Sequence, residues 1–448
     1  MCRTGSAVSL RRVRIHPSPR LLPLVLVVLG LLAPGPRALR AETEGPVDAH
    51  VTTPTLGPPH DHPPVEADPD LTLAETIRLA LERDPGLVGV EARQVEGRAL
   101  ERASRRWLAG APALYGGAVS DSPVGSDIGY RQWDAGLELP LWWPGQRSPR
   151  RDVARAAKDA AAHAVRVQAL EVAGQVRAAV AGLALARRRL ELARGDREAE
   201  ARLAERVERA VELGELAGRE ALLARTSVLE RELAELEALE ELRHAEASWV
   251  VLTGIERSPG EWGETLRSDA RLEDHPALLL ARDDQAQAEA NAARLERSGW
   301  GHPTVSVGSQ HGRDTRPEKY IHRVVAGLSV PIGRADPVST GAIDARRAAT
   351  DARRDAMRLE RELRANLLHS EHRLDLAGQR LDATASQARL AADYLARTER
   401  GFVLGEVDLP TLVAARGRAR AATLSHHEAV LMHRFLIAET NQALGVVP

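Results

Sequence analysis

The most regular pattern of hydrophobic positions lies between Thr340 and Leu404. Leucine or alanine recurs there at seven-residue steps, with two further leucines at intermediate spacing: Leu367, Leu374, Leu381, Ala388 and Leu395, and Leu359 and Leu363. Such a heptad repeat, without proline, predicts one continuous helix. At about 1.5 Å per residue this helix is about 95 Å long. An ordinary globular domain is narrower, so the pattern indicates a rod, a bundle or a conduit.

The end of this helix is also marked. Gly401 and Gly405 provide a helix C-terminus, and Asp408 provides the N-cap of a following helix that begins at Leu409. The segment 401–410 therefore predicts a sharp turn between two helices.

Two hairpins of alternating polarity are predicted, with strands at 113–121 and 131–142 and at 304–310 and 321–332. In the second strand of each hairpin, one face is apolar and the other carries polar or tiny residues. Strands of about ten residues with this alternation are typical of membrane β-barrels, although a half-buried soluble sheet alternates as well. Each hairpin leads into a very long helix and has no other predicted strand to pair with, which favours the barrel. The expected lipid-facing residues are Trp133, Leu137, Leu139, Val324, Leu328 and Val330.

Four tryptophans, Trp133, Trp142, Trp143 and Trp300, are candidates for an aromatic girdle at the membrane surface. Packing at the junction of strand and helix is an equally good interpretation for any one of them.

The chain matches itself at a constant offset of 191 residues. The matched pairs include Pro85 and Pro276, Pro112 and Pro303, Gly136 and Gly327, Pro140 and Pro331, Gly214 and Gly405, and Gly254 and Gly445. This indicates a tandem duplication. Repeat 1 covers 71–254 and repeat 2 covers 275–446, with a linker at 255–274. Each repeat is predicted to hold a helix, a β-hairpin (113–142 or 304–332), a long helix and a return helix.

Four strands per chain are too few to close a barrel, because the smallest membrane barrels have about eight. Open sheet edges are not tolerated in lipid. If the hairpins are in the membrane, several copies of the chain must share one barrel.

The N-terminal region is predicted to be a secretory signal over 1–41, followed by a linker over 42–70 that is rich in proline, histidine and acid. The signal has an arginine-rich start and a short apolar core, Leu21 to Ala33, which is too short to span a bilayer, and no later segment is apolar enough to do so. Removal of the signal takes away seven arginines and no acids, so the formal charge changes from −2 to −9. An acidic chain argues against nucleic-acid binding. The only cysteine, Cys2, leaves with the signal, and a disulfide-free exported chain suggests a bacterial periplasmic or outer-membrane protein.

Candidate chemistry is sparse. Histidines occur at 50, 60 and 62 in the linker, and as His369, His372, His426, His427 and His433 later, but without the spacing of a zinc site. The N-terminal histidines fit either a metal-catching tail or a disordered linker. The sequence contains no phosphate-binding loop and no nucleophile motif. We therefore expect no enzymatic activity, no cofactor and no metal site.

The duplicated order of helix, hairpin, long helix, turn and helix resembles the TolC-like outer-membrane efflux proteins over residues 71–446. The strand ends Gly136–Pro140 and Gly327–Pro331 support the resemblance, as does the turn 405–409 with Leu412, Ala415 and Arg416. It implies a mainly α fold, with a long antiparallel coiled-coil helical barrel and four transmembrane strands per chain. It also implies a homotrimer with a twelve-stranded barrel in outer-membrane lipid, joined to a periplasmic adaptor and an inner-membrane efflux pump.

The resemblance further implies that the two helix turns are periplasmic tips that contact the adaptor and constrict the pore. Gly214, Glu215, Gly405, Glu406 and Asp408 are the expected tip residues. The first turn lacks the Asp and Pro of the second, so its contacts need not be equivalent. The acids at the tips, which include Glu212, suggest a cation-favouring constriction, with helix capping as the alternative.

The function expected from these features is a passive exit duct of a tripartite efflux system, and the N-terminal histidines favour metal cations as cargo. A type I protein-secretion duct and a periplasmic structural coiled-coil protein are the alternatives.

Overall fold

The computed structural model describes residues 63–448 except 122–127, 300 and 334–339. The expected signal peptide, most of the expected 42–70 linker and Trp300 lie outside the described residues. The helices are α1 (Leu73–Arg83), α2 (Leu87–Ser104), α3 (Arg147–Glu212), α4 (Gly218–Thr253), α5 (Pro276–Ser298), α6 (Thr340–Val403) and α7 (Leu409–Ala443), with a short 3₁₀ turn at Leu272–Asp274. The strands are β1 (Glu66–Asp68), β2 (Ala113–Ser120), β3 (Arg131–Pro140), β4 (Arg257–Pro259), β5 (Thr304–Arg313) and β6 (Ile321–Ser329). The fold is therefore mainly helical with a small β part.

The two longest helices carry the architecture. Helix α3 has 66 residues and α6 has 64, so each is nearly 100 Å long at about 1.5 Å per residue. The long helix predicted over 340–404 is confirmed. Helix α3 begins two residues before Pro149, which lies in the first turn, where its missing N–H costs no hydrogen bond.

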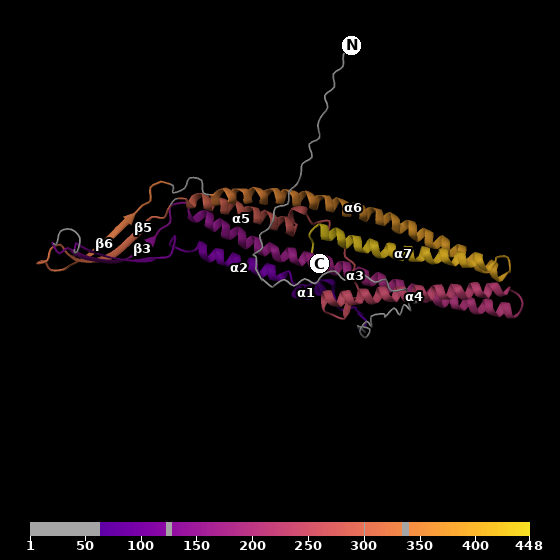
Figure 1. Cartoon of the computed structure of the whole chain (residues 1–448). Coiled ribbons are helices and arrows are strands. Elements are labelled where there is room, and N and C mark those ends of the chain that lie inside the picture. The colour runs from indigo at the N-terminus through magenta and orange to yellow at the C-terminus, as the bar shows by residue number, and fades with distance from the viewer. Residues whose placement is uncertain (1–62, 122–127, 300, 334–339) are drawn as a thin grey trace, which may run out of the picture. The chain divides into compact units, whose positions relative to one another are not determined.

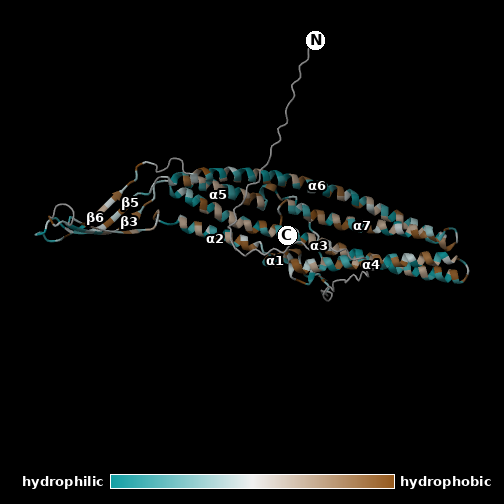
Figure 2. Ribbon diagram, in the orientation of Figure 1, coloured by the Kyte–Doolittle hydropathy of each residue, from teal (hydrophilic) through white to brown (hydrophobic). Residues whose placement is uncertain are grey.

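The helices lie side by side, with the sheet at one end and the turns α3–α4 and α6–α7 at the other (Figure 1). Helix α3 contacts α2, α4, α5 and α7, and α6 contacts α5 and α7. Brown, hydrophobic positions alternate with teal ones along these helices (Figure 2).

The main core lies around the middle of α3. An apolar stripe of α3 is buried there against α1, Trp249 of α4 and Trp262; it consists of Val172, Val176, Val180 and Leu183. Helix α3 also contains an 18-residue window that is apolar enough to cross a membrane by composition, of which 44% is buried within the fold. The expectation that no segment after the signal has such a composition is therefore wrong. The buried part of this apolar surface packs against the neighbouring helices.

Helix α6 has a second row of residues at heptad spacing, beside the row of leucines. Four small residues at or near seven-residue intervals, Ser370, Ala377, Thr384 and Thr398, are buried, whereas Leu367, Leu374, Leu381, Ala388 and Leu395 are only half-buried. Small side chains let two helix backbones approach closely, which explains why α7 lies on this row. The leucines stay half-buried within one chain, and Leu395 packs against the cluster around Leu409 and Leu412.

The four strands β2, β3, β5 and β6 form one antiparallel sheet in the order β2-β3-β5-β6. Gly136 and Gly308 are opposite one another at its centre, and a β-carbon on Gly136 would lie 2.6 Å from the hydroxyl of Tyr115. The glycines therefore make room for this tyrosine. Strands β3 and β6 end before the expected residues 142 and 332, because Pro140 and Pro331 cannot donate to a neighbouring strand.

A second, two-stranded sheet joins the two segments that were expected to be linkers. Strand β1 pairs in parallel with β4, and Glu66 is opposite Arg257. Val65, Ser258 and Trp262 next to these strands are buried. The sequence pattern did not predict this sheet, because each strand is only three residues long.

Candidate channel surfaces

The apolar face of the large sheet is its more exposed face within one chain. In β3 and β5 the apolar-face positions Trp133, Leu137 and Val307 are exposed, whereas Asp134, Glu138 and other residues of the polar face are half-buried. In β6, Val324 is 86% and Leu328 is 67% exposed. Of the other expected lipid-facing residues, Leu139 is half-buried and Val330 is exposed beyond the end of β6. A sheet in a soluble core shows the opposite distribution, with the apolar face covered.

The polar face is held together by side-chain hydrogen bonds. Tyr130 donates to Gln132, which donates to Asp134 over 2.6 Å, and Gln310 donates to Asp134 over 3.4 Å. These bonds link β3 to β5 along a polar face, and a polar inner face is typical of a water-filled barrel.

The tryptophans at the two ends of the sheet have different surroundings. Trp133 stacks with His311 and Tyr320 on the apolar face, at centroid distances of 5.9 and 5.5 Å. Trp142 donates its indole N–H to the carbonyl of Arg106 and lies under the guanidinium of Arg150. Trp142 thus packs at the junction of strand and helix, which is the second interpretation that its sequence allowed.

The two helix turns have the same backbone geometry. Gly214 and Gly405 have φ values of +78° and +75°, in the left-handed region that favours glycine. After each glycine the next amide donates back to the helix, Glu215 to Ala210 and Glu406 to Gly401, over 2.8 and 2.9 Å. Each long helix therefore ends in a Schellman motif.

The turns differ in how the return helix begins. The Asp408 carboxylate accepts a hydrogen bond from the Thr411 amide at 3.1 Å and caps α7, whereas the N-cap residue of α4 is Ala217, whose side chain cannot cap the helix. Hydrogen bonding by the side chain of Thr411, and then by its backbone amide, lowers the pKa of Asp408 from its ordinary value. Asp408 is therefore a helix cap in this structure. Glu406 of the same turn and Glu212 and Glu215 of the other turn are exposed.

Exposed apolar residues flank the acids at these turns. Leu213 at the first turn and Val403 and Leu404 at the second are each more than two-thirds exposed. Behind them, Leu409 and Leu412 of α7 are buried against Leu203 and Val207 of α3. The two turns thus form one packed tip with an apolar and acidic outer surface.

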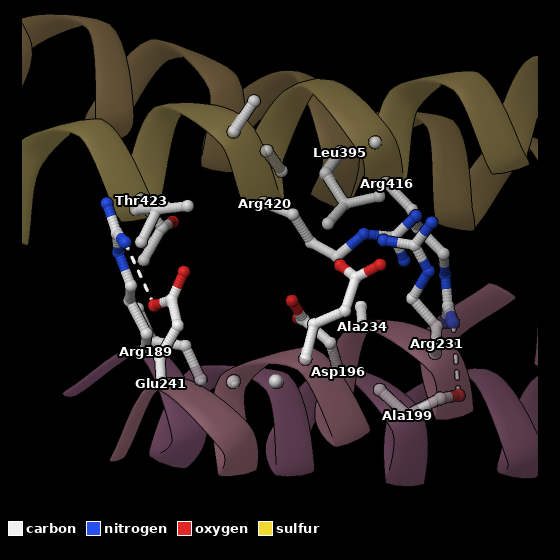
Figure 3. A pocket seen from close by; sticks show the side chains of 18 of the residues that line it. Arg189, Asp196, Ala199, Arg231, Ala234, Glu241, Leu395, Arg416, Arg420 and Thr423 are labelled. Carbon is white, nitrogen blue, oxygen red and sulfur yellow. Dashed lines mark hydrogen bonds and ion pairs between the residues drawn. The ribbon is translucent and has the colours of Figure 1, made fainter. Parts of the chain in front are cut away.

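A charged groove of about 760 Å³ lies between the α3–α4 pair and the α6–α7 pair, toward the tip. Figure 3 shows Arg416 and Arg420 of α7 facing Asp196 of α3 and Arg231 of α4 across it. Burial raises the pKa of Asp196 from its ordinary value, and the nearby Arg420 and Arg231 counteract this shift.

One buried carboxylate organises the tip side of this groove. Glu200 has a side chain only 1% exposed; Arg420 contacts its carboxylate over 2.8 Å and Arg416 over 3.6 Å. Arg416 also donates to the Glu399 carboxylate of α6 over 2.8 Å and to the Ala199 carbonyl over 3.1 Å. These bonds join α3, α6 and α7, and the pattern of apolar positions gave no indication of them. A buried charge on an amphipathic helix is visible only when its partners on other helices are known.

The late histidines do not gather into one site. Burial lowers the pKa of His427, and the neighbouring Arg188 lowers it further. His426 lies near Thr384. In the described part of the chain, no three potential metal-ligating side chains lie together.

The comparisons with known proteins agree with this geometry. The family described as outer membrane efflux protein matches residues 76–254. The chain is similar to the solved outer membrane protein VceC from Vibrio cholerae, with a TM-score of 0.68 and 14% identity over 83% of this chain and 96% of that one. It is also similar to the CmeC outer membrane channel from Campylobacter jejuni (TM-score 0.63, 14% identity, 83% and 85% covered) and to the MtrE outer membrane channel from Neisseria gonorrhoeae (TM-score 0.62, 17% identity, 85% and 89% covered). No curated protein sequence matches the chain.

The order of elements, the exposed apolar face of the sheet and these similarities define an outer-membrane channel of the efflux class. Residues 76–254 carry the match to the outer membrane efflux protein family, and the solved channels show the same fold over more than four-fifths of the chain. Proteins of the matched family and the solved channels lie in the bacterial outer membrane and extend into the periplasm, and they are passive channels rather than enzymes.

Proposed function

We propose that three copies of the chain form a sealed duct, with a twelve-stranded β-barrel in the outer membrane and a helical tunnel in the periplasm. The duct is the exit component of a tripartite efflux system, in which an inner-membrane pump supplies the energy and a periplasmic adaptor joins the pump to the helical tips. Substrate then leaves passively through the barrel.

The exposed apolar face of the sheet is the observation on which this proposal depends. Val324 and Leu328 are 86% and 67% exposed, although full burial of such a side chain stabilises a protein by about 1.5–3 kcal/mol. Lipid provides this burial without a second protein layer, which the periplasmic coiled-coil alternative would need. On this basis Trp133, Leu137, Leu139, Val324, Leu328 and Val330 face lipid.

The need for several copies is supported by the edges of the sheet and by helix α4. Strands β2 and β6 are the outer strands of the sheet and each has one neighbour. In addition, Leu222, Leu229 and Leu236 form a heptad row on α4 that is 66%, 60% and 61% exposed within one chain. A row of this length and spacing fits the side of a neighbouring helix in an assembly. We assign it to the contact between protomers.

The proposed tandem duplication is supported by matching backbone features. Gly254 and Gly445, which are 191 residues apart, both have left-handed φ values at the ends of the return helices, and so do Gly214 and Gly405 at the turns. The element order helix, hairpin, long helix and return helix also recurs, within 71–254 and again within 275–446. The expected linker at 255–274 then joins the two repeats, and its strand β4 pairs with the N-terminal strand β1.

The tip is the proposed gate. Gly214, Glu215, Gly405, Glu406 and Asp408 form the periplasmic end, where the exposed Leu213, Val403 and Leu404 provide apolar contacts for a helical adaptor. The network around Glu200 holds α7 on α3 in the closed form. Adaptor binding then opens the tip by moving α7 and α6 away from α3.

We propose metal cations as the cargo, because the tip surface is acidic and histidines occur at 50, 60 and 62. Deletion of the gene should lower resistance to zinc or copper salts more than resistance to organic antibiotics. Equal resistance to metal salts with and without the gene would refute the cargo but leave the duct intact.

Membrane fractionation combined with gel electrophoresis tests the duct itself. We expect the processed chain in the outer-membrane fraction and in detergent extracts, with a band that shifts when the sample is heated in SDS. A processed chain that stays in the soluble periplasmic fraction without a heat-dependent shift would refute the barrel and favour the structural coiled-coil protein.

A further inference from the structure

Two histidines are placed directly opposite one another on the strands β5 and β6. His311 pairs with His322 in the sheet register, and both lie on the same face as Trp133, toward the turn that joins the two strands. Their Nδ1 atoms are 3.2 Å apart, and their ring centroids are 4.1 Å apart. The transport function proposed above assigns no role to this pair.

The distance between the two nitrogens fits two ligands of one metal ion. Imidazole nitrogens bind zinc at about 2.0–2.1 Å, so two ligands at a tetrahedral angle are about 3.3–3.4 Å apart. In a square-planar copper site, right-angle geometry at the same bond length brings them to about 2.9 Å. The 3.2 Å separation lies between these values. A single N–H···N hydrogen bond between neutral rings spans the same distance, and a metal would replace its proton.

The rings are also held in place before any ion arrives. His311 stacks on Tyr320 at 4.8 Å with an interplanar angle of 11°, and on Trp133 at 5.9 Å with an angle of 23°. Tyr320 in turn lies under the guanidinium of Arg313. The aromatic stack therefore fixes one ligand, and the register of the sheet fixes the other. His322 is exposed within one chain and lies next to the turn between β5 and β6, at the end of the lipid-facing face, where water at the membrane surface can complete the coordination sphere.

We propose that His311 and His322 form a surface site for a borderline divalent transition-metal ion, zinc or copper, which clamps β5 to the outer strand β6. Neutral imidazoles are suitable ligands for these ions and poor ones for magnesium or calcium. The two imidazoles are the protein ligands of the proposed site, and Asp314 in the turn between β5 and β6 is 4.0 Å from Arg323. Only the position of the site near the outer membrane surface rests on the proposed function; the metal chemistry rests on the sheet alone.

Zinc titration of the full processed chain in detergent, followed by calorimetry, tests the site. The background carries H50A, H60A and H62A, which removes the N-terminal histidines. We expect H311A and H322A each to abolish binding of one zinc ion per chain or to weaken it at least about tenfold, since loss of even a second-shell partner costs 10- to 100-fold. Because the two residues share one ion, the double variant should lose no further ion. The matched control H426A/H427A, which removes an adjacent pair on α7, should bind zinc as the background does.

Two results would overturn the site: unchanged zinc binding in the double variant, or loss of the ion in only one of the single variants. Copper binding to the unsubstituted pair gives a second test that needs no variant to fold. One equivalent of Cu²⁺ added to the background protein should give an electron paramagnetic resonance spectrum with coupling to two imidazole nitrogens, and coupling to one nitrogen alone would contradict the proposal. Neither measurement involves transport, so failure of the site leaves the duct untouched, and failure of the duct leaves the site testable.

Discussion

The buried carboxylate of Glu200 gives the sharpest test of the proposal that its ion pairs hold the tip closed. Glu200→Ala removes the shared partner of Arg416 and Arg420, whose side chains are 10% and 17% exposed. The two guanidinium groups, one turn apart on α7, would then lie beside one another without the carboxylate that they share. We expect α7 to separate more readily from α3 while the rest of the fold is retained.

The loss of stability in Glu200→Ala depends on the contacts that Arg416 and Arg420 retain. Removal of one partner of a fully buried ion pair costs about 3–5 kcal/mol. Arg416 retains its contact with Glu399 at 2.8 Å and with the Ala199 carbonyl at 3.1 Å, and Arg420 is partly accessible to water. The loss should therefore be smaller, about 2–3 kcal/mol. This corresponds to an opening equilibrium about 30- to 150-fold more favourable.

Hydrogen exchange of the α7 backbone over 409–424 measures this opening directly. Exchange should accelerate by that factor in Glu200→Ala, with a smaller effect in Glu200→Gln, which keeps the shape but not the charge. The control is Glu82→Ala, because Glu82 and its partner Arg78 are both more than half exposed and such a pair contributes about 0.5 kcal/mol or less. Unchanged exchange over 409–424 in a folded Glu200→Ala protein would refute the reasoning.

Three further predictions concern the assembly, the cap and the sheet. Replacement of the three exposed leucines of α4, Leu222, Leu229 and Leu236, by asparagine should shift the assembly from trimer to monomer, as measured by light scattering. Burial of the exposed 60% of each leucine side chain is worth about 1–2 kcal/mol, and asparagine loses it. A trimer of unchanged mass would show that these leucines are not in the interface. Asp408→Ala should raise passive antibiotic or ion leakage or weaken adaptor cross-linking, and wild-type values in both assays would count against the tip assignment. Since the pKa of Asp408 is lowered, its cap is fully present above the ordinary value of 3.8 and is lost only as the pH falls below it, so wild-type tip opening should rise in acid and Asp408→Ala should lack this step. Gly136→Val should abolish the heat-dependent gel shift because its side chain would collide with Tyr115, and the additional change Tyr115→Ala should restore the shift; loss of the shift in both would mean that the collision is not the cause.

The order of the long helices and of the strands along the chain was predictable from the sequence, because these elements have strong periodic patterns. The heptads of α6, the alternation of β3 and β6, and the glycines of both turns each follow from a local rule that one stretch of chain reveals. Pro85 likewise marks the break between α1 and α2. These features fixed the order and ends of the elements within a few residues.

The contacts that hold the tip were not predictable from the same patterns. Glu200 and Arg420 look like solvated charges in an amphipathic helix, and only the approach of α7 to α3 buries them together. The short strands β1 and β4 escaped notice for a related reason, because three residues carry no measurable alternation. His311 and His322 are eleven residues apart in sequence and meet only through the register of β5 and β6.

The mass of the complex extracted from outer membranes tests the central claim most directly. Native mass spectrometry of the processed chain in detergent should give a particle of three copies, because one chain supplies four of the strands that a closed barrel needs. A processed chain that stays monomeric and dissolves without detergent would contradict the account.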